Sequence, residues 1–293
     1  MIYIIYEKKW VCDKIINIWK KYNDGKYTND INKATKIWLF NHYMYKKVPK
    51  IGLEVIVTIH HLEESKLDVE EFREMDEVVS YYHSISPKTT EILRKYTSKK
   101  IVELVMPLDV GDNFFMVGKN ELRKKWGFKE NDFLIGNFQR DTEKNGEPKL
   151  EKGPDILVKL LENYGDNLVV VLSGYRRGYL VKELERRGIR YFYGENVGER
   201  EMNELYNILD LYVISSRVEG GPRVVFECAL SRCPVVGTDV GVVGVILGKE
   251  SIYDWRDLGS YGVVRPNVEE AYKNVVKYLA PVYMIEFNMR LFG

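Results

Sequence analysis

Cysteine is scarce in this sequence, and the few cysteines present are poorly spaced for a shared role. Only three occur in 293 residues, Cys12, Cys228 and Cys233. None forms a C-x-x-C pair or lies beside a histidine at metal-ligand spacing. We therefore expect neither a disulfide framework nor a zinc site, and this usage is typical of a reducing, cytoplasmic compartment.

Long apolar runs are also missing. Residues 1–6 are mostly apolar, but the charged residues 7–9 follow at once, so this start is too short for a signal peptide. No run approaches the ~20 apolar residues that a membrane span needs. We expect a protein that is soluble, or at most peripheral at a membrane.

An excess of charge of one sign is absent as well. The 44 basic and 43 acidic residues give a net charge of +1, so no global field indicates a nucleic-acid template. The distribution is uneven, because residues 1–50 hold 11 lysines against 4 acidic residues. Two interpretations stay open for this basic region: peripheral contact with an anionic membrane or acceptor, and an ordinary solvated surface.

The sequence does contain a regular alternation of short apolar runs and amphipathic segments, typical of βα units around parallel sheets. Its length suits two domains, with a boundary near residue 118. We expect strands at residues 2–6, 36–40, 54–59, 77–81, 133–136, 168–173, 190–193, 211–215 and 234–238. The last segment, 268–293, reads as a helix broken at Pro281.

The most informative stretch spans residues 216–227. A strand leads into a Gly220-Gly221 turn, and Pro222 is placed to start a helix. Free backbone N–H groups at such a helix start suit a diphosphate. Glu219 precedes the helix and Glu227 lies inside it, so the two carboxylates can reach different parts of one ligand. Spacing alone leaves the alternative of a surface glutamate and a helix glutamate open.

Here the sequence resembles a known family. Glu219 and Glu227 match the E-x7-E motif of retaining glycosyltransferases, and residues 229–238 are similar to the continuation "EAMA-x-G-x-PV-V" of glycosyltransferase family 4. The family's glycine before "x-PV" is Arg232 in this chain. The resemblance implies an α/β GT-B fold, two Rossmann-like domains with parallel sheets facing a central cleft. In it, residues 1–118 bind the acceptor, residues 119–267 bind the nucleotide sugar, and residues 268–293 cross back to the first domain. This crossing implies that the packing residues of the last segment are Tyr283, Met284, Ile285, Phe287 and Met289.

The resemblance also assigns donor-binding residues. Residues 135–141 and 148–155 are similar to the family's "G-x-x-x-x-x-KG" element, so Arg140 and Lys152 would hold the nucleotide diphosphate, where fixed cations stabilise the leaving group. Gly174 and Glu195 follow strands at which the family places donor and base contacts. The remaining donor-binding positions implied by the motif are Gly220, Gly221, Pro222, Arg223 and Glu227.

The first half matches the family less closely. Residues 55–61 resemble the "V-x-T-x-H" strand end of the acceptor domain, which implies that His60 and His61 are catalytic-site residues beside the transferred sugar. The family's glycine-rich loop after the first strand has no counterpart, because residues 7–13 contain no glycine.

The activity implied is that of a retaining, hexosyltransferase-type enzyme with front-face transfer, in which Glu219 holds donor-sugar hydroxyls. The substrate would be a UDP- or GDP-sugar, with no further cofactor. No metal is expected, because an Asp-x-Asp motif is lacking. The acceptor is a glycan, a lipid-linked molecule or a protein. The alternatives are an enzyme of similar architecture, such as an epimerase or a phosphorylase, and a degenerate subunit that binds a nucleotide sugar or glycan without transfer.

Overall fold

The computed structural model describes residues 1–109, 113–140 and 142–293, and it divides into two compact units. One unit comprises Met1–Asp109 together with Tyr278–Gly293, and the other comprises Val110–Lys277. These limits differ from the boundaries at residues 118 and 267 expected from the sequence. The chain between 268 and 277 packs with the second unit, and only the segment after it belongs with the N-terminal unit.

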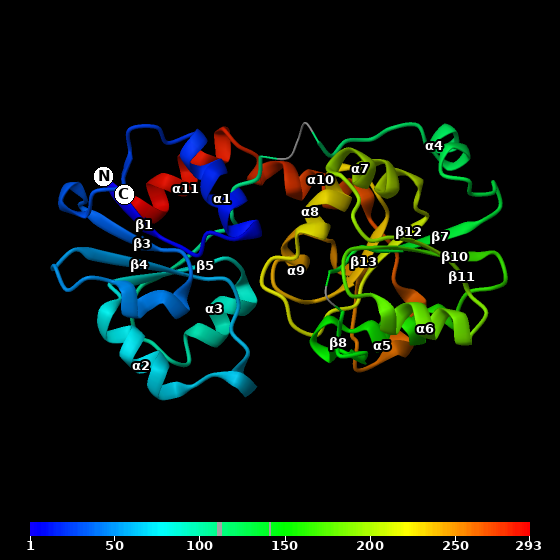
Figure 1. The fold of residues 1–293 in the computed structure, drawn as a ribbon, viewed down its shortest axis with the longest axis horizontal. Coiled ribbons are helices and arrows are strands. Elements are labelled where there is room, and N and C mark those ends of the chain that lie inside the picture. The colour runs from blue at the N-terminus through cyan, green and yellow to red at the C-terminus, as the bar shows by residue number, and fades with distance from the viewer. Residues whose placement is uncertain (110–112, 141) are drawn as a thin grey trace. The chain divides into compact units, whose positions relative to one another are not determined.

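The first unit is built on a parallel sheet (Figure 1). Its described strands have the order β2-β1-β3-β4-β5-β6, with bounds β1 (Ile2–Ile5), β2 (Tyr27–Thr28), β3 (Lys36–Leu39), β4 (Glu54–Ile59), β5 (Tyr81–Ser84) and β6 (Ile101–Glu103). Helices α1 (Trp10–Lys21) and α11 (Val282–Phe292) lie on one face, and α2 (Val69–Val78) and α3 (Pro87–Leu93) lie on the other.

Helices on both faces explain why the central strands are apolar at almost every position. In β3, Trp38 packs into the core beneath α1 and α11, whereas Ile37 and Leu39 pack into the core beneath α2. Because side chains alternate along a strand, each face of the sheet receives its own apolar set. Of the five residues predicted to pack in the C-terminal segment, Tyr283, Met284 and Phe287 are buried.

Two predictions about packing and one about a strand are wrong. Ile285 and Met289 are 64% and 71% exposed, because they lie on the outward face of α11. Residues 77–81 were expected as a strand, but α2 continues to Val78 and β5 begins only at Tyr81. The cause lies at the start of α2, where the Asp68 side chain accepts hydrogen bonds from the backbone of the first turn and fixes a helix that the sequence pattern did not indicate.

The second unit holds a second parallel sheet of six described strands in the order β11-β10-β7-β12-β13-β14. Their bounds are β7 (Phe133–Asn137), β10 (Leu168–Ser173), β11 (Arg190–Gly194), β12 (Leu211–Ile214), β13 (Val235–Thr238) and β14 (Ile252–Tyr253). A small antiparallel hairpin, β8 (Glu143–Lys144) and β9 (Glu147–Pro148), follows β7.

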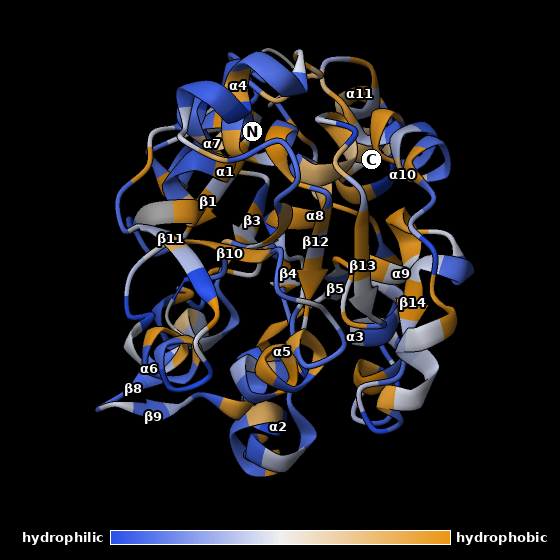
Figure 2. Cartoon of the chain, turned by 90° about the vertical axis from the view of Figure 1, so that its right-hand side faces the viewer, coloured by the Kyte–Doolittle hydropathy of each residue, from blue (hydrophilic) through white to orange (hydrophobic). Residues whose placement is uncertain are grey.

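Helices cover both faces of this sheet too. On one face lie α5 (Pro154–Leu161) and α6 (Gly178–Arg186), and on the other lie α7 (Glu199–Ile208), α8 (Arg223–Leu230) and α10 (Val268–Val275) (Figure 1). The other α-helices described in this unit are α4 (Lys119–Lys125) and α9 (Val243–Ile246). Figure 2 shows hydrophobic residues along β12 and on α5 and α8, as expected for elements that build this core.

Candidate functional site

Three central strands of the second sheet bring the predicted donor-binding segments to one edge. Strand β7 pairs with both β10 and β12, all in parallel. Arg140 follows β7, Gly174 follows β10 and Glu219 follows β12. The carboxyl ends of parallel strands share one edge of a sheet, and ligands of open α/β sheets bind there.

Glu219 and Lys152 form an ion pair at this edge. Lys152 Nζ lies 2.7 Å from Glu219 Oε1, and the two side chains are 30% and 17% exposed. Ser216 Oγ donates a second hydrogen bond to the same carboxylate oxygen, at 3.1 Å. Lys152 and Glu219 are therefore in direct contact, although they are 67 positions apart in the sequence. Motif similarity assigned Lys152 to the diphosphate and Glu219 to the sugar.

Gly153 explains how Lys152 reaches Glu219. Its φ of +62° is a left-handed conformation, and a Cβ atom there would lie 1.8 Å from the carbonyl oxygen of Ser215. Only glycine lets the start of α5 approach the end of β12 so closely. Arg217 ties the same two segments by a bidentate ion pair with Asp155, at 2.8 and 2.6 Å. Although burial acts to raise it, this pairing holds the pKa of Asp155 below its usual value.

The Gly220–Gly221 turn is held from behind by the loop after β13. Val242 donates its backbone N–H to the carbonyl oxygen of Gly220 at 3.0 Å. Gly241, with a φ of +51°, leaves room for this contact, because a Cβ atom there would lie 1.8 Å from the same oxygen. Pro222 is the N-cap of α8, and its side chain makes no capping hydrogen bond to the first turn that begins at Arg223. The N-terminus of α8 therefore presents backbone N–H groups beside Gly221 that the N-cap side chain does not occupy.

Glu227 and Glu219 are held in place by different residues. Tyr206 donates its hydroxyl to Glu227 Oε2 at 2.8 Å, and Arg223 Nε lies 3.5 Å from Glu227 Oε1. Both partners come from the α7–α8 side of the sheet. The E-x7-E carboxylates thus have separate supports, as expected if they contact separate parts of one ligand.

Arg140 and Gly174 are neighbours. A Cβ atom on Gly174 would lie 3.0 Å from Arg140 Cγ, and the φ of Gly174 is +94°. The Arg140 guanidinium stacks over the ring of Tyr175, 5.0 Å from its centroid. Glu195 is exposed and directly follows β11. The pKa of Tyr193 is raised, first by burial of its hydroxyl and then by the nearby carboxylate of Glu195.

Arg177 is a residue of this edge that sequence analysis missed. Its side chain is 1% exposed and donates to the backbone oxygens of Asn137, Gln139 and Ser173. Burial lowers its pKa to about 10. None of the described carboxylates pairs with it. Arg177 therefore ties together the ends of β7 and β10, which lead directly into Arg140 and Gly174. In the sequence, only its position after the Gly174 turn indicates this role.

In the first unit, the two predicted histidines differ in environment. His60 is largely buried, its Nε2 lies 3.0 Å from the carbonyl oxygen of Phe40, and burial lowers its pKa to about 3. The ring is therefore neutral at pH 7. His61 is exposed. His42 lies close to both, and its pKa is lowered to about 4 by burial and then by the nearby His61. The structure thus adds His42 to the group at the carboxyl ends of β3 and β4.

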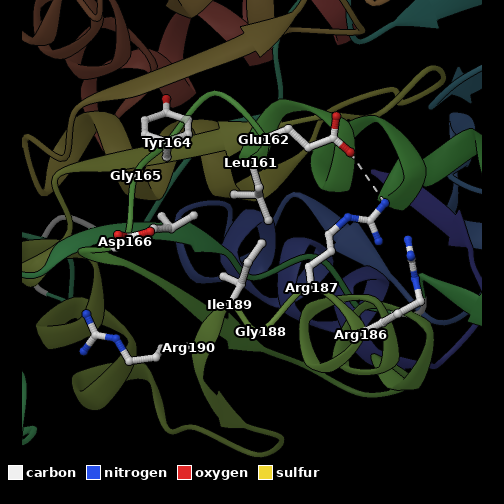
Figure 3. Close-up of a pocket in the computed structure, with 11 residues that line it drawn as sticks. Leu161, Glu162, Tyr164, Gly165, Asp166, Arg186, Arg187, Gly188, Ile189 and Arg190 are labelled. Atoms are coloured by element: carbon white, nitrogen blue, oxygen red, sulfur yellow. Dashed lines mark ion pairs between the residues drawn. The ribbon is translucent and has the colours of Figure 1, made fainter.

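A pocket of about 530 Å³ lies at the opposite edge of the second sheet (Figure 3). It is lined by the segments 161–168 and 186–190, which precede β10 and β11, and it contains none of the residues predicted from the sequence. Its three arginines already have carboxylate partners: Arg187 pairs with Glu162 and Glu183, Arg186 with Glu183, and Arg190 with Asp132. We therefore place the candidate site at the carboxyl edge, where the predicted residues meet.

The described residues contain neither a candidate metal cluster nor a candidate membrane span. No group of three or more His, Cys, Asp or Glu side chains in residues 1–109, 113–140 and 142–293 is arranged to hold a metal ion. Likewise, no helix in this part of the chain has the length and apolar character required to cross a bilayer.

Similarity to solved structures extends over nearly the whole chain. Alr3699/HepE from Anabaena, in complex with UDP and glucose, has a TM-score of 0.73 at 13% identity, covering 98% of this chain and 97% of that one. The sucrose-phosphate synthase from Thermosynechococcus elongatus has a TM-score of 0.71 at 11% identity, covering 97% and 79%. WaaG, a glycosyltransferase involved in lipopolysaccharide biosynthesis, has a TM-score of 0.62 at 13% identity, covering 97% and 92%.

Sequence comparison is more restricted. No curated protein matches the chain significantly. The model of the family described as "Glycosyl transferases group 1" matches residues 118–254, which contain all the predicted donor-binding residues discussed above. With its two parallel six-stranded sheets, the chain has the GT-B fold of its structural neighbours, and its residues 118–254 match the glycosyl transferases group 1.

Proposed function

We propose that the protein is a retaining glycosyltransferase that moves a sugar from a nucleoside-diphosphate sugar to an acceptor hydroxyl. The observation that carries the proposal is the Lys152–Glu219 ion pair at the carboxyl edge of the second sheet. It joins a cation suited to a diphosphate and a carboxylate suited to sugar hydroxyls in one place, within the segment that matches the family model.

In the proposed reaction, the bond between the sugar C1 and the diphosphate oxygen breaks as the acceptor oxygen bonds to C1 from the same face. The acceptor proton passes to the leaving diphosphate. Arg140, Lys152 and the N-terminus of α8 stabilise the charge that develops on that leaving group. This chemistry requires no metal ion, so we expect activity to persist in EDTA.

We propose UDP as the first nucleotide to test, since structural neighbours were determined with UDP and UDP-glucose. The acceptor is proposed to bind the first unit near His60, whose neutral ring can exchange hydrogen bonds with a sugar. Family 4 membership, hexosyl specificity, and peripheral membrane contact through the basic residues 1–50 stay predictions.

The test is thermal stabilisation by UDP, UDP-glucose, GDP and GDP-mannose in the wild type, Arg140→Ala and Glu227→Ala. At 100 times its dissociation constant, a ligand adds about 2.7 kcal/mol to the stability of the folded state. We expect one nucleotide pair to stabilise the wild type and to lose this effect in both variants. Lys159→Ala, which removes an exposed lysine of α5, is the matched control and should behave like the wild type.

If none of the four compounds raises the melting temperature of the wild type, the proposal is wrong. A degenerate binding subunit is the second candidate, favoured by the absence of a glycine-rich loop in residues 7–13. The two are separated by incubating UDP-glucose without acceptor: slow hydrolysis is expected of a transferase, and none of a binding subunit.

A further inference from the structure

A chain of hydrogen bonds supports Glu219 from inside the second unit. Gln139 Nε2 donates to Ser216 Oγ at 2.5 Å, and Ser216 Oγ donates to Glu219 Oε1 at 3.1 Å. Gln139 is 6% exposed and Ser216 is fully buried. Sequence analysis singled out neither residue, because the chain depends on how the end of β7 meets the end of β12.

The direction of every hydrogen bond in this chain is fixed by Glu219. A carboxylate paired with lysine can only accept hydrogen bonds, so the Ser216 hydroxyl must donate its single hydrogen to Glu219. The Ser216 oxygen can then only accept from Gln139, which must present its NH₂ group. The amide oxygen of Gln139 is consequently left buried without a partner among the described residues.

The two carboxylate oxygens of Glu219 differ in the hydrogen bonds that they accept. Oε1 receives hydrogen bonds from both Lys152 and Ser216. Oε2 has no hydrogen bond to any residue that the structure describes. A carboxylate held by one oxygen in this way keeps a single orientation, and its second oxygen can accept from a ligand without rearrangement.

We propose that Ser216 and Gln139 are positioning residues for the donor sugar: they hold Glu219 so that Oε2 accepts a hydrogen bond from a hydroxyl of the transferred sugar. This inference rests on the proposed function and adds to it a division of labour within the site. Ser216 and Gln139 act on the recognition of the sugar, whereas recognition of the nucleoside diphosphate does not depend on them.

The buried amide oxygen of Gln139, which has no partner among the described residues, allows a positioning role to be distinguished from a stabilising one. A buried acceptor without a donor destabilises the folded state. Methionine has a similar length and no such acceptor, so Gln139→Met should leave the melting temperature unchanged or raise it. A residue kept for stability would show the opposite.

The experiment measures dissociation constants of UDP and UDP-glucose by titration calorimetry, or of GDP and GDP-mannose if only the guanine compounds stabilise the wild type. For Ser216→Ala and Gln139→Met, we expect nucleotide-sugar affinity to fall about tenfold relative to nucleoside-diphosphate affinity, the scale of one hydrogen bond to a charged group. Ser216→Thr retains the hydroxyl and should restore most of the loss.

Ser231→Ala is the matched control. It removes another buried hydroxyl of the same unit, which donates to Asn203 at 2.8 Å and is outside this hydrogen-bond chain. It should leave the ratio of the two affinities unchanged. An unchanged ratio in Ser216→Ala and Gln139→Met would overturn the inference, and so would an equal loss of both affinities. Failure of every nucleotide to bind the wild type would instead refute the proposed function.

Discussion

At the scale of single residues, Arg232 has a backbone conformation that suits a different amino acid. Its φ is +52°, in the left-handed region, directly after α8. The backbone N–H of Cys233 donates to the carbonyl oxygen of Cys228 at 2.9 Å, which closes the helix end as a glycine-type cap does. This is the position at which the resembled family has glycine. The structure thus gives the physical reason for that glycine, and it shows Arg232 adopting the same conformation.

We predict that Arg232→Gly is more stable than Arg232→Ala by about 1 kcal/mol, because alanine retains the left-handed strain and glycine does not. Both substitutions remove the stacking of the Arg232 guanidinium over Tyr272, at 4.1 Å, so this loss cancels in the comparison. Urea unfolding of the two variants measures the difference.

The control is the same pair of substitutions at Lys182, an exposed residue inside α6. There the order should reverse, with alanine more stable than glycine by about 1 kcal/mol. If alanine were the more stable residue at both positions, the assignment of a left-handed cap to Arg232 would be wrong.

Single residues of the candidate site were predictable where a motif carries them, and not otherwise. Glu219, Lys152, Arg140 and Gly174 could be named because they match motif positions of the resembled family. Their contacts could not be named, since a pair such as Lys152–Glu219 depends on how closely α5 approaches β12. Buried polar residues such as Arg177 were missed for the same reason. The sequence does not indicate that the side chain of Arg177 is surrounded by three backbone carbonyl groups.

At the scale of elements, α11 is the clearest example of a segment whose sequence position and structural role differ. It is the last helix of the chain, yet its buried side chains complete the core of the N-terminal unit. Phe287 is fully buried against Trp38 and His83, with ring centroids 6.4 and 5.3 Å away.

We predict that Phe287→Ala destabilises the first unit by about 3–5 kcal/mol, the usual cost of deleting a buried aromatic ring. Ile285→Ala, on the exposed face of the same helix, should change stability by less than about 0.5 kcal/mol. Chemical unfolding followed by hydrogen exchange in β3 and β4 reports on this unit. Equal effects of the two variants would contradict the packing of α11.

Most elements of the sheets were predictable because buried parallel strands are apolar and short. Strands β2 and β14, of two residues each, were not predicted. Among the strands that were predicted, residues 77–81 are wrong, because an apolar pair there ends a helix instead of starting a strand. Val78 is the last residue of α2, and Val79 is buried in the core that also contains Phe72 and Met75 of this helix. Periodicity over so few residues cannot separate the two cases, and the deciding feature was the Asp68 cap ten residues earlier.

At the scale of the whole molecule, the two units differ in how they should respond to acid. All four histidines of the chain lie in the first unit, at positions 42, 60, 61 and 83. Burial lowers the pKa of His42 and His83 to about 4 and that of His60 to about 3. His83 is buried as a neutral ring, since its Nε2 lies 2.9 Å from the carbonyl oxygen of Leu104 and its Nδ1 lies 3.0 Å from the hydroxyl of Thr58.

The sign of the effect follows from these directions. The ordinary pKa of histidine is 6.5, so between about pH 6.5 and 4 the unfolded chain binds protons that the folded unit excludes. The stabilisation from the neutral rings is complete above pH 6.5 and is lost as the pH falls toward 4. We predict that the first unit loses stability over this range, by about 1.4 kcal/mol per pH unit for each buried histidine at most. The second unit has no histidine to contribute.

Hydrogen exchange at pH 7 and pH 5, corrected for the intrinsic exchange rate, tests this prediction. Protection should fall in β3, β4 and β5 and change little in β7, β10 and β12. Replacing His83 with Gln should lower stability at pH 7 but make its pH dependence shallower by about one proton. Equal acid sensitivity of the two sheets between pH 7 and pH 5 would contradict the prediction, because the second unit has no histidine to contribute.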